Sequence, residues 1–307
     1  MTAALERAEA PPDYAAAVSS LAHRERSTGI LAIEGPDRVA FLQGQLTQDV
    51  KTLATGQTLP AAGLTPKGKL IYFGRVLALT DRILLLLPAA CRSAAAAHLG
   101  KYAVFQKVTA RDATAELFEI GLYGPRARTF EPPSAATALP PDGELAGGIL
   151  APVAMRAELD ARLAAAGSRL VQSETAEILR VESGRPRFGK DADESNLPDE
   201  IGLRAAISTT KGCYVGQEVV ARLRTYGRVN RRLVGLRFPA GVIPAGTVIL
   251  DPHKPDLELL RVGSSVVSPR LGPIGLGLAF RDIADGSALT APDESGRVAL
   301  VTPLPFA

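Results

Sequence analysis

Hydrophobic and polar positions follow two different patterns in the two parts of this chain. From residue 228 onward, short apolar runs are separated by turns containing Gly or Pro at intervals of about ten residues, a pattern typical of a small antiparallel β-barrel. The runs are RRLVGLRF, GTVIL, LLRVGSSVV, IGLGLAF and RVALVTP. We therefore predict that residues 228–307 form a separate all-β module.

Residues 21–227 mix strand and helix patterns. An apolar strand at Ile30–Ile33 precedes Gly35-Pro36, which favours a helix start, and KLIYFGRVLALTDRILLLLP predicts two strands joined by a turn. The strings CRSAAAAHLGKY and MRAELDARLAAAG predict helices. Residues 1–20 contain two adjacent prolines and are expected to be a loose lead-in, and 126–148 and 185–210 are expected to be irregular. The pattern predicts an α+β body followed by the β module.

Composition narrows the classes of function. The formal net charge is only +3 and tryptophan is absent, which argues against a strongly basic nucleic-acid binder and against a base-stacking platform. The N-terminus has no secretion-signal pattern and no apolar run is long enough to span a bilayer, so we expect a cytoplasmic protein without a membrane partner. The three histidines and two cysteines share no ligand spacing, so no protein-only metal site is expected.

One cysteine lies in an unusually polar, glycine-flanked stretch, KGCYVGQEVVARLR at 211–224. Taken alone, Cys213 would most often be a small buried hydrophobe. Lys211 and the nearby arginines favour the thiolate, which is the reactive form, and Gly212 and Gly216 allow the backbone to turn tightly or to approach a ligand. We predict that Cys213 is a reactive thiol facing a ligand channel.

A run of arginines follows this cysteine. Two interpretations have about equal weight: a solvated face or ion network at a domain junction, and a site for a polyanion or an RNA backbone. The arginines are Arg222, Arg224, Arg228, Arg231 and Arg232.

The string KGCYVGQEVVAR closely resembles the signature of the YgfZ family of folate-binding proteins, relatives of the glycine-cleavage T-protein, an aminomethyltransferase. Three further segments resemble family motifs in the right order: FLQGQLTQDV (41–50), LRVESGRPRFGKD (179–191) and LPDEIGL (197–203). The resemblance covers most of the chain. It implies a T-protein-like ring, in which two α+β subdomains and a C-terminal antiparallel β-barrel surround a central channel.

The same resemblance implies a function. It implies that tetrahydrofolate or a folate derivative binds in the channel, and that the protein helps to assemble or maintain iron–sulfur clusters in other proteins. The implied partners are iron–sulfur proteins, their assembly factors and tRNA-modifying enzymes.

Carried over residue by residue, the resemblance implies a folate-binding set. Glu182 in RVESG matches the glutamate that holds the pterin ring in the T-protein, and a carboxylate can accept two parallel hydrogen bonds from an aminopyrimidine edge. The alternative is that Glu182 is a surface charge at a helix end. Glu200 in LPDEIGL is a weaker second candidate.

Four more residues of this set come from the cysteine motif. Lys211 and Arg222 can meet the glutamate tail of folate as cations. Tyr214 and Gln217 complete the set, although Gln217 can equally be structural, tying the cysteine loop to neighbouring backbone.

One departure from the T-protein pattern argues against its reaction. T-proteins carry a catalytic aspartate in a segment resembling KGKLIYFGRV, and here Phe73 stands near that position with no acid between Gly68 and Arg75. Aminomethyl transfer needs a positioned carboxylate for proton handling, so we predict that this chain is not a glycine-cleavage aminomethyltransferase.

Two functions from different classes remain. The first is a folate-binding accessory factor for iron–sulfur clusters that uses Cys213. The second is a folate-dependent one-carbon transferase or demethylase for a small amine, with its acid recruited elsewhere, such as Glu182 or Asp49. A third and weaker alternative is a tRNA-contacting protein that uses the arginine run.

Overall fold

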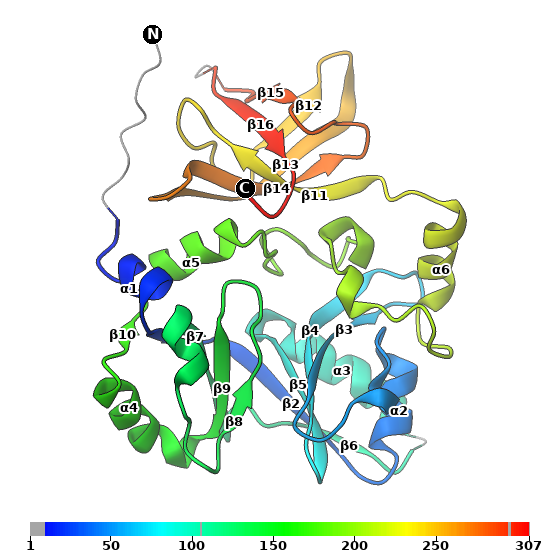
Figure 1. Cartoon of the computed structure of the whole chain (residues 1–307). Coiled ribbons are helices and arrows are strands. Elements are labelled where there is room, and N and C mark those ends of the chain that lie inside the picture. Colours follow the sequence, from blue (N-terminus) through cyan, green and yellow to red (C-terminus); the bar gives the residue numbers. More distant parts are fainter. Residues whose placement is uncertain (1–9, 105, 294–295, 307) are drawn as a thin grey trace.

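The computed structural model describes residues 10–104, 106–293 and 296–306. Within these residues the strands form three sheets, two lying side by side and the third above them, with helices α5 and α6 between the levels (Figure 1). The mixed α+β class that the sequence predicts is therefore confirmed. None of the helices in this part of the chain is long and apolar enough to cross a membrane.

The first sheet carries most of the N-terminal third. Its strand order is β3-β4-β5-β2-β6, and every pair in it is antiparallel. Helices α2 and α3 cover it and bury Phe41, Leu42, Ala95 and Leu99. The elements are β2 (Thr28–Glu34), α2 (Arg38–Gln45), β3 (Thr58–Leu64), β4 (Leu70–Ala78), β5 (Arg82–Pro88), α3 (Arg92–Ala103) and β6 (Thr109–Asp112).

The second sheet has the order β10-β1-β7-β9-β8, with one parallel pair, β1 with β10. Helix α4 packs Leu159 and Leu163 against this sheet. The elements are α1 (Tyr14–Ser19), β1 (Ala22–Glu25), β7 (Leu117–Tyr123), β8 (Thr137–Leu139), β9 (Gly147–Pro152), α4 (Arg156–Ala165), β10 (Arg169–Leu170) and α5 (Ser173–Glu182).

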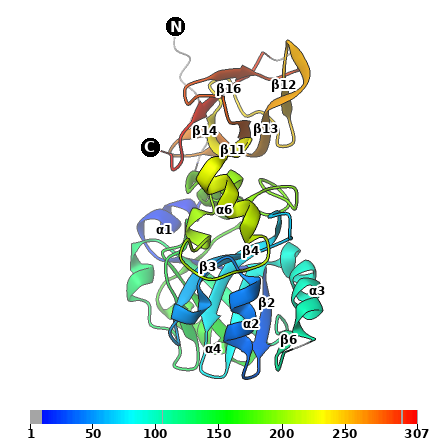
Figure 2. The same ribbon diagram turned by 90° about the vertical axis from the view of Figure 1, so that its right-hand side faces the viewer.

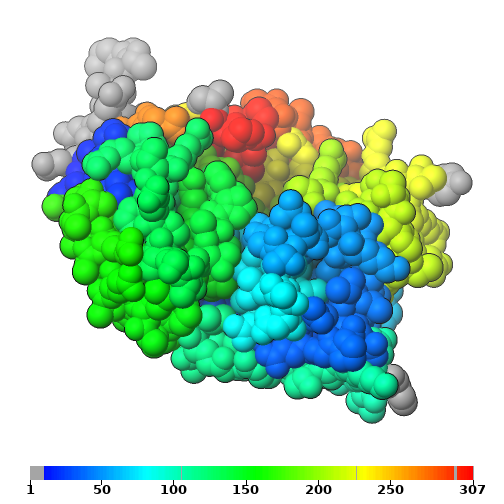
Figure 3. Space-filling model, turned by 60° about the horizontal axis from the view of Figure 1, so that its bottom comes forward, coloured from blue at the N-terminus to red at the C-terminus, as the bar shows by residue number. Residues whose placement is uncertain are grey.

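The two sheets are interleaved along the chain. Strand β1 belongs to the second sheet and β2 to the first, so the chain passes from one to the other at Arg26 and Ser27. A shared core of apolar residues from β2, β5, β8 and β9 lies between the sheets, including Ile30, Leu86 and Leu150. In the space-filling view, the half built on the first sheet (mainly blue and cyan) and the half built on the second sheet (mainly green) are in contact (Figure 3). They therefore form one body rather than separable modules.

The C-terminal strands form a nearly closed antiparallel barrel, as the spacing of apolar runs predicts. The strand order is β12-β13-β14-β11-β16-β15, around a core of its own that includes Val234, Phe238 and Val301. The strands are β11 (Arg231–Arg237), β12 (Val248–Asp251), β13 (Lys254–Ser268), β14 (Gly272–Phe280), β15 (Ala288–Thr290) and β16 (Val298–Thr302). Helix α6 (Gln217–Tyr226) lies between the barrel and the first sheet (Figure 2).

Two segments expected to be irregular contain regular structure. Tyr14–Ser19 in the expected lead-in form helix α1, whose Tyr14 is buried, and Thr137–Leu139 in the expected loop form β8. Both elements are short, and tertiary contacts rather than local propensity stabilise them. Segment 185–210 is irregular apart from short 3₁₀ turns, as expected.

Candidate functional site

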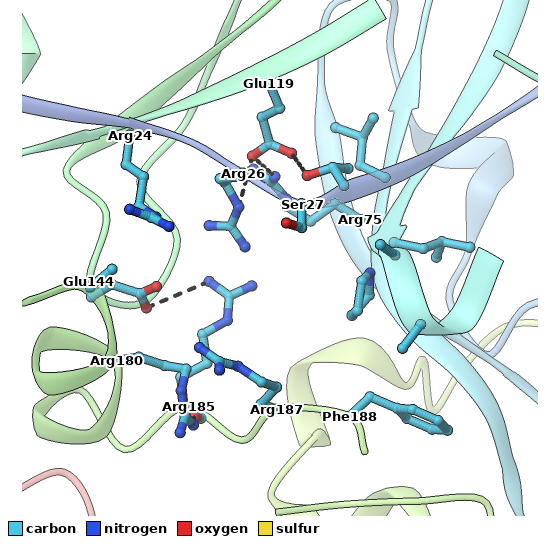
Figure 4. Close-up of a pocket in the computed structure, with 18 of the residues that line it drawn as sticks. Arg24, Arg26, Ser27, Arg75, Glu119, Glu144, Arg180, Arg185, Arg187 and Phe188 are labelled. Carbon is cyan, nitrogen blue, oxygen red and sulfur yellow. Dashed lines mark hydrogen bonds and ion pairs between the residues drawn. The ribbon is translucent and has the colours of Figure 1, made fainter. Parts of the chain in front are cut away.

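A cavity of about 430 Å³ lies where the two lower sheets and the central segment meet. The β1–β2 crossover, residues 24–28, forms one wall, and Phe73–Arg75 of β4 with residues 86–90 forms another. Glu119 and Tyr123 of β7, Glu144 and residues 185–188 close it (Figure 4). Its size is within the range of small-molecule sites, about 300–1,000 Å³.

The lining of this cavity is strongly basic. In the described part of the chain, six arginines line it against three carboxylates. The arginines are Arg24, Arg26, Arg75, Arg180, Arg185 and Arg187, and the carboxylates are Glu25, Glu119 and Glu144. Glu25 is bound on both oxygens by Arg156, which is not among the lining residues, at 2.6 and 2.9 Å.

Glu119 is the most enclosed acid of the cavity. It is 1% exposed, accepts a hydrogen bond from Thr28 Oγ1 at 2.8 Å, and pairs with both Arg75 and Arg26. Arg75 also lies 3.3 Å from Asp142 through its Nε. These contacts occupy the oxygens of Glu119, so this carboxylate is a structural counterion rather than a free base.

Arg75 keeps one nitrogen without a partner. Its side chain is only 9% exposed, and among the described residues the buried Nη1 has no hydrogen-bond acceptor. Leaving a buried charged donor unsatisfied is costly, of the order of 1–3 kcal/mol or more. Arg75 Nη1 is therefore able to donate a hydrogen bond to a ligand in the cavity.

The ion pairs shift the titration of neighbouring groups. Burial alone would raise the pKa of Asp142, but Arg185 and Arg75 outweigh it and hold that pKa below its ordinary value. Likewise, burial opposes ionisation of Glu177, but Arg180, Lys190 and Arg187 lower its pKa to about 2. Both groups are carboxylates at neutral pH.

One end of the cavity is aromatic. The rings of Phe73 and Phe188 are 6.0 Å apart, centre to centre. Figure 4 shows Phe188 apart from the arginines. Phe73, which was expected near the position of the T-protein aspartate, is among the residues that line the cavity.

The predicted folate ligand Glu182 lies outside the lining, at the end of α5. Its carboxylate accepts hydrogen bonds from Tyr14 at 2.8 Å and Ser268 at 2.5 Å, with Arg270 at 3.6 Å. Burial, together with Glu182, raises the pKa of Tyr14 to about 12. Glu182 therefore joins α1 and α5 to the barrel.

Glu200 and Lys211 are also engaged in local structure. Glu200 accepts hydrogen bonds from the Leu197 backbone at 2.9 Å and the Asn196 amide at 3.4 Å, at the start of a 3₁₀ turn. The Lys211 ammonium donates to the carbonyl oxygens of Gln43, Leu46 and Gln48, at 2.6–3.0 Å. Burial lowers the pKa of Lys211 to about 8.

The other predicted residues follow Lys211 in the chain. The Tyr214 backbone donates to Gln217 Oε1 at 3.3 Å, and the buried Tyr214 ring lies 5.0 Å from the Lys211 ammonium. Cys213 and Arg222 are exposed. The structure thus brings Lys211, Cys213, Tyr214 and Gln217 into one turn beside α2, but these residues are not among those that line the cavity.

Comparison with known proteins places the chain in a family. No protein-family model matches it. The tRNA-modifying protein YgfZ of Edwardsiella ictaluri is 31% identical over 305 residues, covering 89% of this chain and 88% of that protein. The chain belongs to the YgfZ family. YgfZ of Yersinia enterocolitica is 28% identical over 314 residues, with coverages of 90% and 89%.

A third relative and a solved structure extend the comparison. The putative chloroplastic transferase At1g60990 of Arabidopsis thaliana is 28% identical over 251 residues, 74% of this chain and 58% of that protein. The crystal structure of the aminomethyltransferase T of Bartonella henselae superposes with a TM-score of 0.86 at 21% identity, covering 96% of this chain and 88% of that one. This YgfZ-family chain therefore has the T-protein fold.

Sequence reasoning missed the charged residues that line the cavity of this YgfZ-family chain. Arg75 and Glu119 are single charges inside otherwise apolar strands, LIYFGRVLA and LFEIGLY. A buried charge in such a run is rarely tolerated without a partner. The two isolated charges could therefore have indicated a buried ion pair. Arg26 and Arg185 lie in connecting segments and carried no comparable signal.

Proposed function

We propose that this protein is a YgfZ-type accessory factor that binds tetrahydrofolate or a folate derivative and supports iron–sulfur cluster assembly or repair. Through iron–sulfur enzymes it would act in tRNA modification in the cytoplasm. Membership of the family supports the proposal, because relatives carry the name tRNA-modifying protein. The T-protein fold supports the folate part.

The observation that carries the proposal is the lining of the cavity at Phe73. A phenyl ring can neither accept a proton nor stabilise a developing positive charge as a carboxylate does. The nearby Glu119 is held by Arg75, Arg26 and Thr28. The cavity is thus suited to holding a ligand, and Phe73 lines it where the resemblance to the T-protein leads us to expect a carboxylate.

A folate fits the chemistry of the lining. The Phe73 and Phe188 rings offer an apolar surface for a flat ring system. Glu144 is only loosely engaged, with Ser183 Oγ at 3.5 Å and Arg185 at 3.9 Å, so its carboxylate can accept from an aminopyrimidine edge. Glu182 remains the ligand predicted from the family motif, and it would have to exchange its bonds to Tyr14 and Ser268.

The loose contacts of Glu144 also favour the second candidate, a folate-dependent transferase or demethylase for a small amine. Of the acids named from the sequence, Asp49 caps a 3₁₀ turn at Lys51 and Glu182 is bound elsewhere. Glu144 is the carboxylate that the cavity offers in their place. Steady turnover of defined amine donors with tetrahydrofolate would support this candidate.

Anaerobic calorimetric titration of tetrahydrofolate into wild type, Glu144→Gln and Glu182→Gln tests the proposal. We expect micromolar binding by wild type. Removing the carboxylate that pairs with the pterin should weaken binding by about tenfold or more, equivalent to 1.4 kcal/mol. Loss confined to Glu144→Gln assigns the pterin to the cavity, and loss confined to Glu182→Gln assigns it to the family-motif glutamate. Absence of binding by folded wild type would refute folate binding.

A further inference from the structure

Two guanidinium groups face each other inside the cavity. Arg26 comes from the β1–β2 crossover and Arg185 from the segment after α5, and Figure 4 shows their side chains pointing toward one another. Arg26 pairs with Glu119 through Nε at 3.3 Å, and Arg185 pairs with Asp142 through Nη2 at 2.7 Å. Glu119 and Asp142 lie to the side and Glu144 lies 3.9 Å from Arg185 Nη1, while the two like charges repel across the gap.

Neighbouring arginines add to this excess of positive charge. Arg24 donates to neutral acceptors, the Val171 carbonyl at 2.7 Å and Ser173 Oγ at 2.9 Å. Arg75 supplies the buried Nη1 that has no acceptor among the described residues. Arg24 thus adds charge that these two acceptors do not neutralise, and Arg75 adds a donor that can serve a ligand.

The alternative interpretation is a purely structural network, in which Glu119, Asp142 and Glu144 neutralise the arginines. Two facts oppose it. Arg75 Nη1 is buried without an acceptor among the described residues, and leaving a charged donor unsatisfied in this way is unfavourable. In addition, the Arg26 and Arg185 side chains are 26% and 24% exposed, so a ligand can reach them.

We propose that the arginine end of the cavity is a binding site for an oxyanion, a carboxylate or phosphate group of a small molecule, bridged between Arg26 and Arg185. The planar guanidinium fork matches both groups through paired hydrogen bonds. Arg24 lies beside Arg26 and adds charge (Figure 4). The site does not depend on folate binding, although the tail carboxylates of a folate are one source of such a group.

The most informative variant is Arg26→Gln. Glu119 would keep its contacts with Arg75 and Thr28, so we expect the fold to survive. Arg26→Lys keeps the charge but removes the fork, and serves as a second variant if Gln is not tolerated. The matched control is Arg224→Gln on α6, which removes an arginine paired with Asp199 at 3.0 Å, outside the cavity lining.

The experiment is calorimetry at low ionic strength with succinate, inorganic phosphate and neutral succinamide as probes, and circular dichroism to check folding. We expect saturable millimolar binding of an anion by wild type and by Arg224→Gln. It should weaken about tenfold in Arg26→Gln and by less in Arg26→Lys, and succinamide should not bind. The preferred anion identifies the source as carboxylate or phosphate.

Two results would overturn the site: no saturable anion binding by folded wild type, or equal binding by Arg26→Gln and wild type. Neither result bears on the titration with tetrahydrofolate, where the variants are Glu144→Gln and Glu182→Gln. Folate binding without anion binding would leave the proposed function intact and remove only this inference.

Discussion

Cys213 and Cys91 have opposite environments. Cys213 is exposed on the turn before α6, whereas Cys91 is fully buried at the start of α3. Burial raises the pKa of Cys91 to about 11, although a hydrogen bond from the Phe73 backbone opposes the shift. Since the thiolate is the reactive form, Cys91 is chemically inert in the folded protein.

We predict that a thiol reagent such as DTNB labels one cysteine rapidly in the native protein and a second only on unfolding. Cys213→Ala should abolish the rapid labelling phase. It should change the free energy of unfolding by no more than about 0.5 kcal/mol, because the site is exposed. If the thiol is functional, this variant should also fail to restore iron–sulfur enzyme activity in cells lacking the protein. Full complementation would contradict the predicted role of Cys213.

At the scale of elements, helix α3 places a histidine against the first sheet. His98 lies 3.3 Å from the Tyr72 hydroxyl through Nδ1, and its buried Nε2 has no partner among the described residues. The ring also packs on Tyr102 at 5.3 Å. Burial, with a smaller effect of Lys101, lowers the pKa of His98 to about 4.

This shift predicts a pH dependence of stability. The unfolded chain protonates His98 near pH 6.5 and the folded one near 4, so the unfolded state binds more protons between these values. The contribution of His98 to the free energy of unfolding should be fully present above pH 6.5 and should be lost as the pH falls toward 4. Urea unfolding followed by circular dichroism should show that the free energy of unfolding falls by about 1–2 kcal/mol between pH 7.5 and 5 because of His98.

His98→Gln is the control for this effect. Glutamine has no titratable group in this pH range, so the variant should lose this part of the slope. An identical slope in wild type and variant would show that other groups produce it.

At the scale of the whole molecule, α5 connects the barrel to the body. Arg180 donates to Asp191 at 2.8 Å and to Ser264 of β13 at 2.6 Å, and Ser264 donates to the other Asp191 oxygen. The neighbouring Gly263 has no room for a side chain, because a Cβ there would lie 2.6 Å from Asp191 Oδ1. The barrel therefore docks through a close approach of backbone to a buried ion pair.

Gly263→Ala should accordingly destabilise the protein by about 1–3 kcal/mol, since the added methyl displaces Asp191 from Arg180. Urea unfolding measures the loss. Gly44→Ala in α2 is the matched control, because nothing lies within 4 Å of its Cβ position, and it should be neutral or stabilising by up to about 1 kcal/mol. Equal stability of the two variants would argue against the docking role of Gly263.

Local sequence patterns predicted most of the regular elements but not the contacts of the site residues. Strands β4 and β5, helices α3 and α4 and the barrel follow from local periodicity, and all are present. Helix α1 and strand β8 were not predicted, because neighbours rather than their own residues stabilise them. Of the predicted site residues, Glu182 and Lys211 have partners distant in sequence, Ser268 and Gln43, which no local pattern reveals.

By itself, the sequence determined the types of most elements, the C-terminal β-barrel and the family, because periodicity and contiguous motifs are local properties. Only the tertiary structure decided which charged residues meet. Arg26, Arg75, Glu119 and Arg185 come from four separate segments, and the passage of the chain between the two sheets at Arg26 and Ser27 brings them together. A cavity lined in this way depends on sheet order and packing, which pair residues without regard to their distance along the chain.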